Sequence, residues 1–194
     1  MTDSLLSRTW RRVLAALAVP LTAAIATGAI AQGVTIKSAE LLPNGSGYAL
    51  EANYDVTLTS TLEDMLHRGI TLTFVTEFEL LTPRWWTFNL WNRTVADYSI
   101  QHRLSYNALT RQYRLAFGAL HQNFDNLTEA MAELGRVRNS LVVRSQEIET
   151  DRAYLAALRL RLDTSQLPKP LQIDALASND WRLSSDWYVW TFKP

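Results

Sequence analysis

Apolar and polar residues alternate along most of the chain after its first thirty residues. In segment 48–58 the even positions are apolar and the odd positions are mostly polar. Segment 70–81 repeats the pattern, with Ile70, Leu72, Phe74, Phe78 and Leu80 on one side and Thr71, Thr73, Glu77 and Glu79 on the other. Successive side chains of a strand point to opposite faces, so this period predicts strands with one face on a core and one in water.

The same rhythm predicts further strands at 34–42, 95–106, 112–117, 156–163 and 188–192. Between the first two strands, Pro43-Asn44-Gly45-Ser46-Gly47 is a hairpin signal. Another possible short strand is Leu141-Val142-Val143, followed by an exposed turn or short helix around Glu147 and Arg152.

Two helices interrupt the alternation. Ser60 with Glu63 three residues later predicts a capping box, and Gly69 predicts the end of this first helix. A second helix is expected to begin at Asp125 or Asn126, with apolar residues at helical spacing: Leu127, Ala130, Met131, Leu134 and Val137. Gly135 lies within that run, and a helix-interior glycine costs about 1 kcal/mol relative to Ala, so the helix is expected to end or bend there.

These elements predict a mainly β fold. Seven or eight short strands with two short helices are typical of an antiparallel β-sandwich, here a single domain over residues 32–194. A curved barrel and an α+β sheet remain alternatives that periodicity does not separate.

The first thirty-one residues have the order of a secretory signal peptide. Arg8, Arg11 and Arg12 precede the uncharged run 13–30, which ends in Ala29-Ile30-Ala31, a small-x-small cleavage pattern. We therefore expect export to the periplasm, with a mature chain that begins near Gln32. The uncharged run also reaches the lower length limit for a membrane-spanning helix, so an uncleaved inner-membrane anchor facing the periplasm is the alternative.

Charge and cysteine content exclude several functions. The chain has 19 basic and 19 acidic residues; without the three leader arginines and Asp3, 16 and 18 remain, a net charge of −2. Nucleic-acid binding requires a basic face, so no nucleic-acid partner is expected. The absence of cysteine excludes disulfides, thiolate metal sites and cysteine catalysis.

No residue pattern predicts a catalytic or metal site, and no cofactor is expected. His67, His102 and His121 are scattered, without a ligand-spaced partner, and His102 is interpreted as a core or rim residue. Glu77 and Glu79 lie about 7 Å apart on one strand face, but two carboxylates in the same surroundings suit a solvated face better than a catalytic pair. The late aspartates Asp163, Asp174, Asp180 and Asp186 lack calcium-loop spacing.

Aromatic residues are the stronger indication of binding. The segment from Arg84 to Trp91 follows Pro83 between two predicted strands and carries large apolar side chains. Such residues stack on sugars, anchor a protein partner, or fold back to cap the sandwich. The binding candidates are Arg84, Trp85, Trp86, Trp91 and Trp187.

Several stretches resemble a family of exported bacterial proteins known as domain of unknown function 4390: 83–86, 104–115, 159–170 and 181–187. The resemblance extends over essentially the whole mature chain and brings no catalytic residues. It implies an envelope setting in a bacterium with two membranes, and genes that often neighbour a nitrogen-type two-component sensor.

Three functions are carried forward as hypotheses. The first is a non-enzymatic module that binds an envelope or inner-membrane protein, associated with assembly or with a sensor. The second is a glycan or peptidoglycan binder that uses Trp stacking. The third is a hydrolase whose site forms only in the fold, with His102 meeting a late aspartate.

Overall fold

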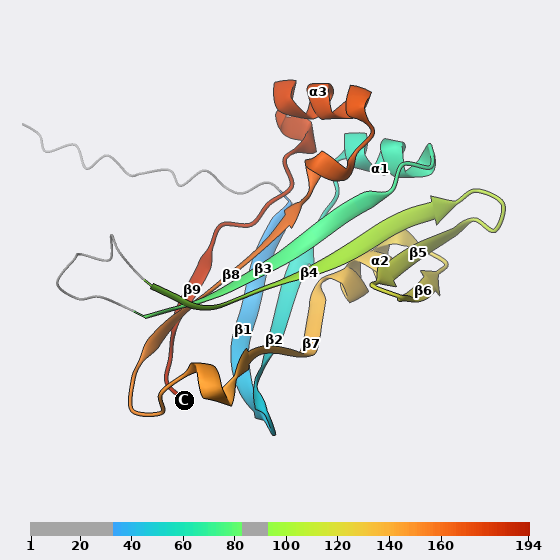
Figure 1. Ribbon diagram of the computed structural model, residues 1–194. Helices are drawn as coiled ribbons and strands as arrows, with labels where there is room; N and C mark the ends of the chain where they lie inside the picture. Colours follow the sequence, from blue (N-terminus) through green and yellow to red (C-terminus); the bar gives the residue numbers. More distant parts are fainter. Residues whose placement is uncertain (1–32, 83–92) are drawn as a thin grey trace, which may run out of the picture. The chain divides into compact units, whose positions relative to one another are not determined.

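The computed structural model describes residues 33–82 and 93–194, and in this part of the chain nine strands form two antiparallel sheets (Figure 1). The small sheet has the order β1 (Val34–Asn44), β2 (Gly47–Val56) and β7 (Arg136–Arg144). The large sheet has the order β6 (Leu120–Phe124), β5 (Gln112–Phe117), β4 (Arg93–Asn107), β3 (Leu72–Thr82), β8 (Tyr154–Leu162) and β9 (Tyr188–Phe192). The helices are α1 (Ser60–His67), α2 (Leu127–Leu134) and α3 (Lys169–Ala177), with short 3-10 turns at Ser145–Glu147, Thr164–Gln166 and Asn179–Trp181. The mainly β, two-sheet prediction is confirmed, with more strands and one more α-helix than expected.

The core lies between the two sheets, where the predicted apolar faces meet. Leu50 of β2 and Phe74, Leu158 and Leu160 of the large sheet are 0% exposed. Burying a side chain of this size contributes about 1.5–3 kcal/mol, so this inner layer is the main source of stability in a chain without disulfides.

The predicted hairpin joins β1 and β2. Asn44 pairs with Gly47, and Gly45 and Ser46 form the two-residue turn, where Gly45 has φ 35°. A second hairpin joins β4 and β5, in which Tyr106 faces Tyr113, with ring centroids 4.9 Å apart.

The outer face of β3 is less solvated than its polar residues predicted. Thr73 and Val75 are both 5% exposed, although they point away from the core. The chain leaves β8 through the 3-10 turn Thr164–Gln166 near this end of β3, and the Asp163 amide donates to the Thr73 carbonyl at 2.7 Å. The end of β8 and the turn that follows it therefore lie against this end of β3.

Both helix predictions hold, with corrections at the ends. The N-cap of α1 is Thr59 rather than Ser60, since the Thr59 hydroxyl accepts from the Leu62 amide at 3.3 Å. The α2 helix begins after Asn126, whose side chain accepts from the Glu129 amide at 2.8 Å, and it ends at Gly135. Val137 is therefore wrong as a helix residue: it lies in β7 and is 4% exposed.

Two segments differ from the sequence interpretation. In the sequence, two prolines directly after Leu167 favour an extended segment along a sheet edge. This prediction is wrong: the stretch begins α3, because a helix tolerates proline in its first turn, where the missing amide has no partner to lose. The short polar run Ser184-Ser185-Asp186 before the last strand predicts a turn from the sequence. Instead, Ser184 bridges to Arg161, and the Ser185 amide donates to the Leu160 carbonyl at 2.8 Å.

Candidate functional site

Only one of the five predicted binding residues lies in the described part of the chain. Arg84, Trp85, Trp86 and Trp91 fall outside it. Trp187 is 38% exposed, and the guanidinium carbon of Arg159 lies 4.5 Å from its ring centroid. This is cation–π geometry, so one face of the ring is already occupied.

Arg159 also belongs to an ion-pair network on the outer face of the large sheet. One oxygen of Glu77 accepts from Arg159 Nε at 3.0 Å, and the other accepts from Arg161 Nε at 2.8 Å. Burial raises the pKa of Glu77, but the hydrogen bonds and positive charges of Arg161 and Arg159 outweigh burial and hold the pKa below its usual value. Glu77 is thus a fully engaged carboxylate that links β3 to β8, rather than a free acid or base.

His102 lies on the inner face of β4 and is 3% exposed. Its cross-strand neighbours are Phe74 and Phe117, and the Phe117 ring meets it edge-on with centroids 4.8 Å apart. Burial lowers the pKa of His102 to about 4, and no charged group contributes to this shift. These surroundings confirm a core position, and the Nδ1 atom of His102 has no hydrogen-bond partner among the described residues.

The other two histidines have different surroundings. His67 Nε2 lies 2.7 Å from the Tyr113 hydroxyl, and the His67 ring meets Tyr106 edge-on. His121 is exposed on β6. Within residues 33–82 and 93–194, no three His, Asp or Glu side chains gather closely enough to hold a metal ion.

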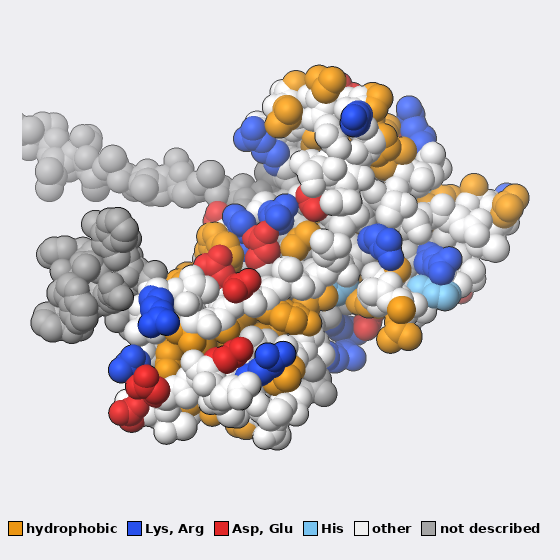
Figure 2. Space-filling view, viewed as in Figure 1, with side chains coloured by type: hydrophobic (Ala, Val, Ile, Leu, Met, Phe, Trp, Pro, Cys, Tyr) orange, Lys and Arg blue, Asp and Glu red, His pale blue; other side chains and the backbone are white. Residues whose placement is uncertain are grey.

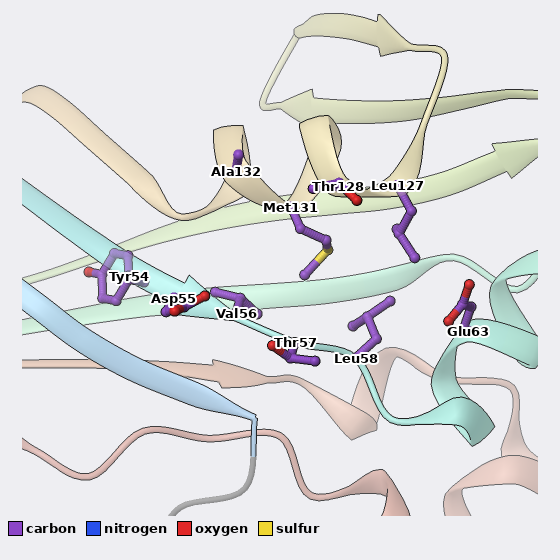
Figure 3. Close-up of a pocket in the computed structure, with 10 residues that line it drawn as sticks. All are labelled: Tyr54, Asp55, Val56, Thr57, Leu58, Glu63, Leu127, Thr128, Met131 and Ala132. Carbon is purple, nitrogen blue, oxygen red and sulfur yellow. The ribbon is translucent and has the colours of Figure 1, made fainter.

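A cavity of about 340 Å³ opens between the end of β2, α1 and α2 (Figure 3). Met131 and Leu127 point from α2 towards Leu58, and Glu63 of α1 lies at one side. Asp55, the other acidic residue that lines the cavity, forms an ion pair with Lys37 at 2.9 Å. No histidine is among the described residues that line this cavity, so it offers a hollow of mixed polar and apolar lining rather than a nucleophile–base pair.

A second hollow, of about 300 Å³, lies between β4 and β7. We name it the β4–β7 groove; its lining residues are Val95, Ala96, Asp97, Tyr98, Leu141, Val142, Val143, Arg144 and Glu147. Figure 2 shows hydrophobic side chains gathered in the band between the positions of β4 and β7 in Figure 1. Tyr98 and Leu141 are 40% and 36% exposed, so large apolar side chains from both sheets reach solvent here.

The groove exists because the two sheets stop short of closing over each other. β7 is an edge of the small sheet, and β5 covers only the last six residues of β4, His102–Asn107. The sequence analysis did not select these residues. One signal was available, because the predicted strand 95–106 is twice as long as its hairpin partner 112–117, which leaves half of it without that neighbour.

Comparison with known proteins identifies a family but no characterised relative. A family model described as Domain of unknown function (DUF4390) matches residues 31–191. No curated protein and no solved structure matches the chain. Among the described residues, no helix has the length and apolar character needed to cross a membrane.

Proposed function

The chain belongs to the DUF4390 family, whose description assigns no activity, and we propose that it is a non-enzymatic protein-binding module of the bacterial cell envelope. It is exported by its leader to the periplasmic side of the inner membrane, where it binds an envelope or inner-membrane protein through the β4–β7 groove. The leader pattern in residues 1–31 and the resemblance to exported proteins support the location.

The observation that carries this proposal is the exposure of Tyr98. This side chain lies opposite Phe78 on the inner face of the large sheet, where Phe78 is 1% exposed, yet Tyr98 is 40% exposed. Tyrosine is enriched among the residues that dominate protein–protein binding, and large apolar side chains that reach solvent together mark such surfaces.

The described geometry gives less support to the two alternatives. A sugar ring stacks on an open aromatic face, but Arg159 already covers one face of Trp187. A hydrolase would need a base next to a nucleophile or a second charged group, whereas aromatic rings flank His102. Protein binding therefore remains the leading proposal.

Site-specific photocrosslinking tests the binding role, because a chain without cysteine accepts a single label cleanly. Full-length Arg144→Cys, an exposed position that lines the groove, and Gln122→Cys, exposed on β6, are each labelled with a benzophenone maleimide and irradiated with native envelopes. We expect a discrete crosslinked protein from Arg144→Cys that is absent from Gln122→Cys. Identical products from both positions, or none from Arg144→Cys, would reject the groove as the binding surface.

Fractionation tests the location separately. A chain that begins near Gln32 in the periplasmic fraction supports export with cleavage, and a full-length chain in the inner membrane supports the anchored form. A full-length chain confined to the cytoplasm would overturn the envelope proposal.

A further inference from the structure

Half of β4 has a free edge. All of β3 pairs with β4, from Thr82↔Arg93 to Leu72↔Leu104. On the other side of β4, pairing with β5 begins only at His102. On the β5 side, residues 93–101 therefore have no strand partner within the described chain. Backbone amides and carbonyls along such an edge are available for pairing with another strand.

The other sheet edges carry features that hinder strand addition. β1 has a bulge between Ile36 and Ser38 and contains Pro43, while β6 and β9 are five residues long. β7 has register shifts against β2. The stretch 96–101 contains no proline or lysine. It also has no bulge, because the register shift between β3 and β4 comes before residue 96. Natural proteins usually protect edges with such devices, so an edge without them suggests a pairing function.

Both faces of this edge indicate the chemistry of the incoming strand. On the inner face, Tyr98 borders the β4–β7 groove opposite Leu141 and Val143, which suits apolar side chains. On the outer face, Asp97 lies directly across from Glu79, and neither forms an ion pair with a Lys or Arg of the described residues. Like charges opposite one another destabilise a strand pair, so a basic side chain beside Asp97 relieves the repulsion.

We propose that residues 96–101 of β4 receive an extended segment of another protein as an added β-strand, with apolar side chains in the β4–β7 groove and a Lys or Arg beside Asp97. The inference rests on the proposed protein-binding function and names the kind of partner. A second copy of this chain fits less well, because pairing the two β4 edges would bring a second Asp97 to the same acidic edge.

Synthetic peptides test the inference on the full chain. The probe is a fluorescein-labelled peptide, Thr-Val-Lys-Val-Thr-Val-Thr, compared by fluorescence anisotropy with the same peptide carrying Glu in place of Lys. Opposite-charge pairing should make the Lys peptide bind about fivefold more tightly. Asp97→Lys should reverse that preference, whereas Asp174→Lys, the same charge change at an exposed position of α3, should leave it unchanged.

Backbone pairing has its own control. N-methylation of alternate peptide amides blocks only one edge of the added strand, so one methylated register should lose binding and the other should retain it. Equal binding by both registers, or an unchanged Lys preference in Asp97→Lys, would overturn strand addition. If the chain alone forms a dimer in light scattering and Asp97→Lys abolishes it, the proposal that the added strand comes from a different protein is wrong.

The two levels of proposal fail differently. If Arg144→Cys captures a partner but neither peptide binds, protein binding stands and strand addition is wrong. If the Lys peptide binds with the expected reversal but no partner is captured, the edge is competent and the envelope-partner proposal is wrong.

Discussion

Glu77 links two arginines of the neighbouring strand, and its contribution to stability depends on its charge. We expect Glu77→Gln to lower the free energy of unfolding by about 1–2 kcal/mol at neutral pH, a value discounted for partial exposure. The folded-state pKa lies below the unfolded value of about 4.3, so the contribution is present above that pH and lost as pH falls through the folded pKa. Urea unfolding followed by Trp fluorescence should show wild type and variant converging in acid.

Glu79→Gln is the matched control, on the same strand and face. Glu79 forms no ion pair with the described residues, so this change should shift the free energy of unfolding by less than about 0.5 kcal/mol. Equal losses from both variants would mean that the Arg159–Glu77–Arg161 network is not the stabilising feature.

Burial of His102 should lower the free energy of unfolding as the pH falls, in a pH range above the one in which Glu77 acts. Burial lowers its folded-state pKa to about 4, whereas an unfolded histidine has a pKa of about 6.5. The unfolded chain therefore takes up a proton first as the pH falls from about 6.5 to 4, which costs the folded state about 2–3 kcal/mol. His102→Leu lacks this titration, so its free energy of unfolding should change less across that range.

The slope against pH is the measurement that matters for His102, because the substitution also alters packing against Phe117. His121→Gln, at an exposed position of β6, should keep the wild-type slope. A wild-type slope in His102→Leu would assign the acid sensitivity to other groups.

At the scale of elements, Gly135 joins α2 to β7 through a close backbone approach. A Cβ built on Gly135 would lie 2.5 Å from the Tyr54 carbonyl oxygen, and the Tyr54 amide donates to the Gly135 carbonyl at 2.7 Å. Although Ala favours helix, we expect Gly135→Ala to destabilise the fold by about 1–3 kcal/mol, because backbone must move. Urea unfolding midpoints measure the loss.

Ala132→Gly, at an exposed position in the same helix, measures helix propensity alone and should cost about 1 kcal/mol. An increase in stability from Gly135→Ala would show that propensity, rather than the approach to Tyr54, determines the choice of glycine.

Elements whose residues follow a clear period were predictable from the sequence. The last strand, 188–192, and the strand 112–117 have the expected bounds. β6 was missed because it is short and mostly exposed, so burial imposes no alternation on it. α3 was missed because two prolines dominated the interpretation, although proline in a first helical turn costs little.

The candidate site was less predictable than the fold for a physical reason. A free edge depends on where neighbouring strands stop, and periodicity within one strand contains no information about its neighbours. The alternation of 95–106 placed Tyr98 on an apolar face, but only the late start of pairing with β5 leaves that face open. Aromatic content directed attention instead to 84–91, which lies outside the described residues.

At the scale of the whole molecule, the pairing pattern predicts how amide hydrogen exchange is distributed. β3 lies between β4 and β8, paired with both from Phe74 to Leu81, so its amides should exchange only through global unfolding. In β4, residues 102–104 are paired on both sides, whereas residues 96–101 are paired with β3 alone. Alternate amides from 96 to 101 should therefore exchange much faster than their neighbours.

Exchange of the full chain, read at single residues by NMR, distinguishes an open edge from a covered one. Fast exchange at every second residue of 96–101, next to uniform protection of 102–104, is the expected pattern, since antiparallel pairing engages alternate amides. Uniform protection over 96–101 would mean that another part of the chain already pairs with this edge. Adding the Lys peptide should slow the exposed alternate amides and leave β3 unchanged, because the added strand bonds only to the free side of β4.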